Sequence, residues 1–141
     1  MEFKRKDISE LIKQFTTKRV LIIGDVMVDS YMWGKVNRIS PEAPIPVVSV
    51  TGREYRLGGA ANVALNIKSL GAEPILCSVI GDDDKALVFS DLLKQNSMCA
   101  DGLVKLSGRK TTTKTRIISG SQHLLRVDDE IDTALENSDS D

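Results

Sequence analysis

Residues 58–71 read Gly58-Gly59-Ala60-Ala61-Asn62-Val63-Ala64-Leu65-Asn66-Ile67-Lys68-Ser69-Leu70-Gly71. The double glycine opens a short, almost wholly apolar helix, and Asn62 is the polar side chain in the first turn. A helix start exposes unpaired backbone N–H groups, and glycine lets a ligand approach them closely. The turn is therefore suited to hold a hydroxyl-rich molecule, although a pair of glycines alone is also typical of a tight strand-to-helix turn.

The glycines that follow extend this pattern. Gly71 stands after the last apolar residue of the helix, where a C-terminal cap belongs, and Gly81 ends an apolar strand. The arrangement resembles the first signature of the ribokinase-like (PfkB) carbohydrate kinases. Paired glycines, an asparagine two residues after an alanine, a small residue at Ala64 and glycines at set distances are all present.

A second pair of segments narrows the resemblance. The segments are Ile22-Ile23-Gly24-Asp25-Val26-Met27-Val28-Asp29-Ser30-Tyr31 and Arg38-Ile39-Ser40-Pro41-Glu42-Ala43-Pro44-Ile45-Pro46-Val47-Val48. They look like the kinase domain of the bifunctional ADP-heptose synthase family, and the resemblance runs from about Val20 to Asp129. It implies phosphorylation of the C1 hydroxyl of D-glycero-D-manno-heptose 7-phosphate, a step toward the inner core of lipopolysaccharide.

The composition indicates one globular domain with an ordinary core. The chain has 141 residues, 41% of them hydrophobic, and a formal net charge of −1 from 19 basic and 20 acidic residues. We therefore expect no nucleic-acid partner and no membrane association. No apolar run approaches a membrane span, and the N-terminus does not resemble a signal peptide, so we expect a cytoplasmic protein. Cys77 and Cys99 are far apart, and we expect buried thiols and no metal site.

The order of apolar segments predicts an α/β fold. Residues 6–15 have helical spacing, and residues 20–23 form a continuous apolar run typical of a strand buried on both faces. The expected order is strand 20–23, helix 60–70, strand 75–80, helix 84–96 and strand 103–106. This order predicts the first half of a ribokinase-like, doubly wound and mostly parallel sheet, in which ligands bind outside the carboxyl ends of the strands.

Two segments, 31–50 and 111–127, do not fit that core. The first contains short extended runs at 31–36 and 46–50, and the second contains a hairpin turn at 119–122. Together they predict a small separate β lid within a domain of residues 1–129. The family resemblance implies that this lid covers the sugar and forms a homodimer contact. Residues 130–141 form an acidic tail or a truncated continuation, which we expect to be exposed or disordered.

Four residues are candidates for binding the sugar itself. Asp29 lies just beyond the first strand, and a carboxylate accepts strong hydrogen bonds from vicinal hydroxyls. The resemblance implies that Asp29 is the sugar-binding aspartate and that Gly58, Gly59 and Asn62 line the same site. Asp25 competes for the carboxylate role, but it is closer to the buried strand and is expected to brace the loop.

Basic residues in the second lid segment are candidates for holding the 7-phosphate. Lys114 and Arg116 share a face of an extended strand because side chains alternate along it. Arg126 can join them, but a two-residue hairpin loop would place it opposite Thr115 and on the other face. A solvated edge strand protected by charge is an alternative explanation for these cations.

The catalytic machinery of the family is expected outside this chain. In ribokinase-like kinases the catalytic base is the aspartate of a late Gly-Ala-Gly-Asp motif, and the 141 residues of this chain contain no such motif. We therefore assign no catalytic residue here, and we expect ATP and Mg²⁺ to be used by the full-length enzyme rather than bound tightly by this chain. The chain looks like a sugar-binding half, as a fragment or a truncated product. The alternatives are a PfkB kinase for another sugar and a non-catalytic sugar-binding or dimerisation module.

Overall fold

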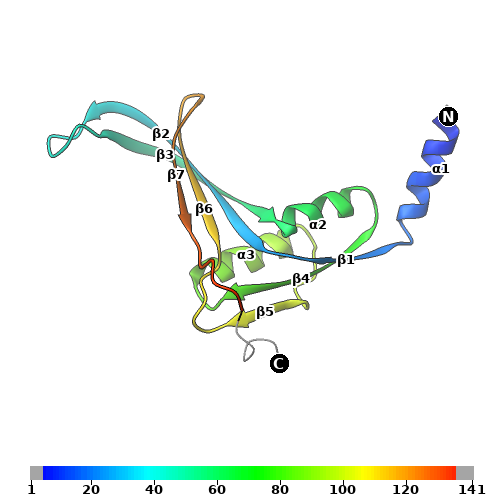
Figure 1. Ribbon diagram of the computed structural model, residues 1–141. Coiled ribbons are helices and arrows are strands. Elements are labelled where there is room, and N and C mark those ends of the chain that lie inside the picture. The colour runs from blue at the N-terminus through cyan, green and yellow to red at the C-terminus, as the bar shows by residue number, and fades with distance from the viewer. Residues whose placement is uncertain (1–4, 136–141) are drawn as a thin grey trace.

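The computed structural model describes residues 5–135 (Figure 1). The last part of the predicted tail, residues 136–141, lies outside the described residues. The helices and strands follow in the order α1 (Arg5–Phe15), β1 (Arg19–Ile23), β2 (Val26–Ile39), β3 (Pro46–Gly59), α2 (Ala60–Ser69), β4 (Glu73–Gly81), α3 (Asp84–Gln95), β5 (Leu103–Leu106), β6 (Thr113–Ser119) and β7 (Gln122–Asp129).

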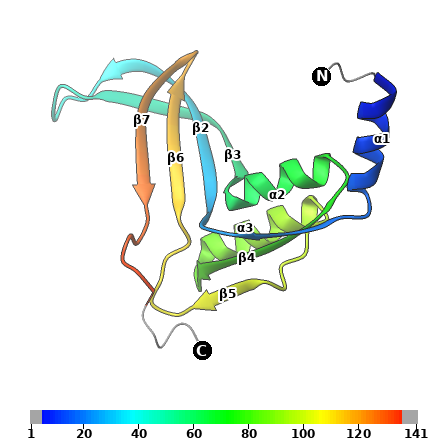
Figure 2. The ribbon, with the colours of Figure 1, turned by 45° about the vertical axis from the view of Figure 1, so that its right-hand side comes forward.

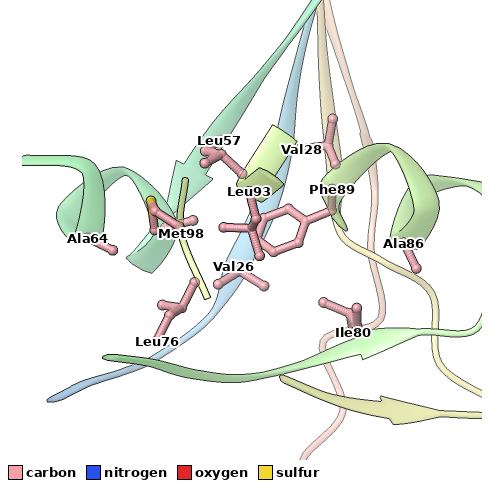
Figure 3. Packing of buried hydrophobic residues seen from close by; sticks show 11 residues of the cluster. Val26, Val28, Leu57, Ala64, Leu76, Ile80, Ala86, Phe89, Leu93 and Met98 are labelled. Carbon is pink, nitrogen blue, oxygen red and sulfur yellow. The ribbon is translucent and has the colours of Figure 1, made fainter. Parts of the chain in front are cut away.

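The core is a parallel three-stranded sheet with the strand order β1-β4-β5. Helices α2 and α3 lie on one face of this sheet (Figure 2). Phe89 and Leu93 of α3 are fully buried among side chains of the sheet and of β2, including Leu76 and Val28 (Figure 3). Burying such side chains contributes roughly 1.5–3 kcal/mol each. The predicted α/β class with a parallel core is confirmed.

The expectation that residues 20–23 are buried on both faces is wrong. Ile22 packs against the core, whereas Leu21 is 59% exposed and Ile23 is 75% exposed. The reason is that α2 and α3 cover the same face of the sheet, the one that carries Ile22 and Leu76. Cys99 is also exposed and Cys77 is only half-buried, so the expectation of two buried thiols is wrong as well.

The segments expected to lie outside the core do share a second sheet. This four-stranded sheet has the order β3-β2-β6-β7, in which β2 pairs antiparallel with β3 and parallel with β6. Its strands form two hairpins, β2–β3 and β6–β7, that extend away from the core (Figures 1 and 2). Strands β2 and β3 are much longer than the short runs expected. They continue into the core because Val26, Val28 and Leu57 are buried there.

The strand register gives the four-stranded sheet two unlike faces. One, which we call the charged face, carries Asp29, Glu54, Arg56, Lys114, Arg116, Arg126 and Asp128. The other, the apolar face, carries Val28, Met32, Leu57, Ile117, Leu125 and Val127.

A register shift in the β6–β7 hairpin decides the position of Arg126. The hairpin has the two-residue loop considered from the sequence, since Ser119 pairs with Gln122. A shift between Ile117 and Ile118 nevertheless places Arg126 opposite Arg116 rather than opposite Thr115. Such a bulge inserts an extra residue into one strand and reverses the alternation beyond it. The expectation that a two-residue loop puts Arg126 on the other face is therefore wrong.

Asp83 connects the start of α3 to the segment that enters β6. Its Oδ1 accepts a hydrogen bond of 2.8 Å from the Ala86 N–H and caps the helix, and its Oδ2 accepts one of 2.8 Å from the Thr111 N–H. The Gly81 N–H donates to the Thr111 hydroxyl at 3.1 Å. Burial by itself would raise the pKa of Asp83, but the hydrogen bonds from Thr111 and Ala86 outweigh it and lower that pKa. These hydrogen bonds therefore anchor the segment that enters strand β6 to the core.

We predict that Asp83→Ala lowers the free energy of unfolding by about 1–3 kcal/mol, because a helix cap and a second hydrogen bond are lost. Urea unfolding followed by circular dichroism measures this change. Asp83→Asn is the matched control. Its amide oxygen can still cap α3, although its NH₂ group cannot accept from the Thr111 N–H. The free energy of unfolding should therefore fall less than in Asp83→Ala.

The stability difference between wild type and Asp83→Ala should depend on pH. Because the folded pKa of Asp83 is lowered, its ionic contribution is complete above the unfolded pKa of about 3.9 and is lost as the pH falls through the folded pKa. The difference between wild type and Asp83→Ala should therefore shrink at acidic pH. Equal stability of the two proteins at pH 6 would contradict the role assigned to Asp83.

Candidate functional site

Asp29 lies on the charged face, at the point where β2 leaves the core. Its Oδ1 accepts a hydrogen bond from Nη1 of Arg116, which belongs to the neighbouring strand β6. Both side chains are well shielded, with 20% of Asp29 and 24% of Arg116 exposed. The Asp29 carboxylate raises the pKa of the Arg116 guanidinium. The carboxylate is therefore held in one orientation by a partner that stays charged.

The double glycine lies directly beside this carboxylate. A Cβ atom at Gly58 would stand 2.5 Å from Asp29 Oδ2 and 2.7 Å from Met27 Cγ, so only glycine fits without movement. Gly59 has φ +59° and is the N-cap of α2. The Ala60 N–H donates to the Asp25 carbonyl at 2.9 Å, so Asp25 braces this turn, as expected, through its backbone.

Asn62 follows in the first turn of α2, but its surroundings differ from those inferred from the sequence. Only Ala61 and Ala64 of this helix are buried, and the Asn62 side chain is exposed. Helix α2 has one face on the sheets, so it is not the fully buried segment that the composition indicated. The structure brings Asp29 and Gly58 into contact, and the role of Asn62 in sugar binding stays a prediction.

The other two predicted cations are paired with carboxylates. Lys114 Nζ lies 3.0 Å from Asp128 Oδ2 and 2.8 Å from Glu130 Oε2, and 18% of its side chain is exposed. The hydrogen bonds to Glu130 and Asp128 raise the pKa of Lys114. Arg126 Nε lies 3.0 Å from Asp128 Oδ1, and its side chain is 60% exposed. Asp128 therefore bridges both cations, and an incoming anion must replace this carboxylate to reach them together.

Arg56 is a residue of this face that the sequence analysis missed. Its guanidinium lies 4.6 Å from the ring centroid of Tyr31, and that of Arg116 lies 5.3 Å from the same centroid. Trp33 stacks on Tyr31 with ring centroids 5.7 Å apart. Arg56 is identified by the pairing of β2 with β3, since it is the Cα partner of Asp29. A long β3 strand predicted from the sequence would have revealed it.

A cavity of about 730 Å³ opens where β1 ends, beside residues 77–79 of β4. Its polar lining includes Asp25, Lys110, Lys114 and Glu130. Residues 130–135 form one side of it, and the Arg109 guanidinium holds that segment by donating to the carbonyls of Ile131 and Thr133.

Of the seven residues predicted for the site, only Lys114 lines this cavity. Asp29 lies next to it, because it is the Cα partner of Lys114 in the sheet. Within residues 5–135, no cluster of three or more His, Cys, Asp or Glu side chains is arranged to hold a metal ion. In the same part of the chain, no helix combines the length and apolar composition needed to cross a bilayer.

The chain belongs to the pfkB family of carbohydrate kinases, whose sequence pattern matches residues 17–140. It is 43% identical over 126 residues to the bifunctional protein HldE of Pelobacter propionicus, covering 89% of this chain and 26% of that protein. It is 51% identical over 115 residues to the bifunctional protein HldE of Actinobacillus succinogenes, covering 82% of this chain and 24% of that protein.

The crystal structure of ribokinase from Cryptococcus neoformans var. grubii, in complex with ADP, has the same fold. It superposes with a TM-score of 0.58 at 22% identity and covers 84% of this chain and 38% of that chain. The resemblance drawn from the sequence is confirmed. The chain spans about a quarter of the length of the curated relatives it matches, with 26% and 24% covered.

We predict that Gly58→Ala weakens sugar binding at least about tenfold, because the new methyl group collides with Asp29 Oδ2 and must displace the carboxylate. Calorimetric titration with the sugar measures the loss. Gly52→Ala is the matched control, since a Cβ at Gly52 of the same strand meets no atom within 4 Å. Equal affinities of the Gly58 variant and wild type would show that the Asp29 carboxylate does not bind the sugar.

Proposed function

We propose that this chain is the sugar-binding part of a kinase that transfers the γ-phosphoryl group of ATP to the C1 hydroxyl of D-glycero-D-manno-heptose 7-phosphate. The product serves ADP-heptose and lipopolysaccharide core biosynthesis in the cytoplasm, where ATP and sugar phosphates are available. The proposal is supported by the pfkB family membership and by the 43% and 51% identity to proteins named HldE.

The observation that carries the proposal is the contact between Asp29 and Gly58. The two residues come from separate motifs, each of which resembles a sugar-kinase signature, and they meet at one carboxylate oxygen. A carboxylate that is already ionised accepts strong hydrogen bonds from sugar hydroxyls. Gly58 has no side chain that would displace that oxygen, which a sugar hydroxyl is proposed to contact.

The phosphate of the substrate is proposed to bind beside this carboxylate, on the charged face. Lys114 neighbours Asp29 in the sheet, lines the cavity, and contacts the same Asp128 carboxylate as Arg126. A phosphate monoester has more oxygens and more charge than a carboxylate, so it can contact both cations in place of Asp128.

Catalysis and nucleotide binding are assigned to residues other than those described. The family is one of kinases, so ATP is the phosphoryl donor, and Mg²⁺ is proposed to accompany it. We assign no Mg²⁺ ligand among residues 5–135, where no group of three or more His, Cys, Asp or Glu side chains is arranged to hold a metal ion. The contribution of this chain is to bind and orient the sugar phosphate.

Two alternatives remain within this proposal: a pfkB kinase for another sugar, and a sugar-binding or dimerisation module without phosphotransfer. Calorimetric binding to a panel of sugars with and without a terminal phosphate separates the substrates. Heptose 7-phosphate should bind most tightly. Tighter binding of a sugar that has no terminal phosphate would contradict the heptose assignment.

We predict that Lys114→Ala lowers the affinity for heptose 7-phosphate at least about tenfold and leaves the affinity for unphosphorylated heptose within about twofold. The reason is that the lysine is proposed to contact only the phosphate. Lys35→Ala is a control for the removal of one lysine, because Lys35 is exposed farther along β2. Equal losses on both sugars would remove Lys114 from the phosphate site.

We also propose that two copies of the chain associate through the four-stranded sheet. Leu125 and Val127 of the edge strand β7 are 58% and 47% exposed on the apolar face. An exposed strand edge with apolar side chains favours pairing with another strand. A second copy offers the same edge and the same side chains.

We predict that Leu125→Lys converts the dimer to a monomer in sedimentation velocity experiments, because the lysine places a charge in the apolar contact. Lys105→Leu serves as a control that changes charge in the other sheet. A wild-type chain that sediments as a monomer at every concentration tested would contradict the dimer proposal.

A further inference from the structure

We infer that Arg116 positions the Asp29 carboxylate for the sugar and does not bind the substrate phosphate. This inference rests on the proposed function, and it separates Arg116 from Lys114, although the two residues share a strand and a face. Their side chains are held by different partners, and of the two only Lys114 lines the cavity.

The Arg116 guanidinium is committed to Asp29. Its Nη1 donates to Asp29 Oδ1, and Tyr31 lies against it with 5.3 Å between the guanidinium carbon and the ring centroid. Only 24% of the side chain is exposed. A cation over an aromatic ring gains electrostatic attraction and loses freedom to turn. Arg116 is therefore held facing Asp29 by a carboxylate and a ring together.

The side chain of Lys114 lies in a different environment from that of Arg116. It lines the 730 Å³ cavity, whereas neither Arg116 nor Asp29 does. Its partners are Asp128 and Glu130, which belong to the end of β7 and to the segment beyond it. An anion entering the cavity meets Lys114, whereas Arg116 lies two residues farther along β6 and does not line the cavity.

The two oxygens of Asp29 have different neighbours. Oδ1 faces Arg116, and Oδ2 is the atom nearest to the position that a Gly58 side chain would take. Anchoring Oδ1 fixes the rotation of the carboxylate and leaves Oδ2 beside the glycine for a sugar hydroxyl. Preorganising an acceptor in this way lowers the entropic cost of binding. Removing the arginine should therefore weaken sugar binding whether or not the sugar carries a phosphate.

The test is a set of calorimetric titrations on the full chain with three probes: heptose 7-phosphate, unphosphorylated heptose and inorganic phosphate. The variants are Arg116→Gln, Arg116→Lys, Asp29→Asn and the double variant Asp29→Asn/Arg116→Gln. Arg53→Gln is the matched control, because Arg53 is an exposed arginine on the opposite face of β3. Thermal unfolding of each variant reports whether it is folded.

We expect Arg116→Gln to lower the affinity for both sugars by about tenfold and to leave that for inorganic phosphate unchanged. Arg116→Lys should retain part of the affinity that Arg116→Gln loses. If the glutamine variant does not fold, the lysine variant tests the same inference. In the Asp29→Asn background, Arg116→Gln should cost little more, because the two residues act as one unit.

Four outcomes would overturn the inference. A loss confined to heptose 7-phosphate and inorganic phosphate would make Arg116 a phosphate ligand. Unchanged affinity for both sugars, or losses that add fully in the double variant, would remove the coupling to Asp29. A wild-type chain that binds neither sugar would overturn the proposed function and this inference with it, and the wild-type titration alone identifies that case.

Discussion

The pairing of β2 with β3 sets the geometry of the whole candidate site. It places Gly58 opposite Met27 and Gly59 opposite Val26, and so brings the start of α2 to the point where β2 leaves the core. Side chains alternate along a strand, so a slip of one residue would move the Asp29 carboxylate to the other face. The buried side chains of Val28 and Leu57 oppose such a slip, because it would expose them.

The same two strands connect the core to the charged face. In its first residues β2 contributes Val26 and Val28 to the apolar cluster around Phe89, and the very next residue, Asp29, already lies on the charged face. A strand fixed at one end by a packed core is a rigid support for a binding group. The hydrogen bonds from Thr111 and Ala86 to Asp83 give strand β6 a comparable anchor.

The sequence predicted the parts of this structure that local patterns determine. Helices α2 and α3, the parallel strands and the hairpin turn at Gly120 follow from periodicity and glycine placement. Long-range register was not predictable in the same way. The bulge that returns Arg126 to the charged face has no local signal, and neither does the choice of which sheet face the helices cover.

The candidate site shows a similar division. Asp29 and Gly58 could be named from motifs, and the structure brings them into contact. The exposure of Asn62 could not be inferred, because a run of apolar residues does not show how much of a helix is covered. The carboxylate partners of Lys114 come from β7 and from the segment after it, and only the folded sheet brings them together.

The pairing of charges constrains how an anionic sugar can be recognised. Each of the cations Arg56, Lys114, Arg116 and Arg126 has a carboxylate within ion-pair distance. The charged face therefore projects little net field, and attraction beyond about one Debye length is weak. Recognition must arise at contact, when the phosphate takes the place of a carboxylate. Asp128 is the carboxylate best placed for this exchange, because it already contacts two of the cations. A ligand with a single carboxylate would gain little over Asp128, whereas a phosphate brings a second negative charge and a third oxygen. On the proposed function, selectivity for a phosphorylated sugar therefore follows from the difference between the two anions.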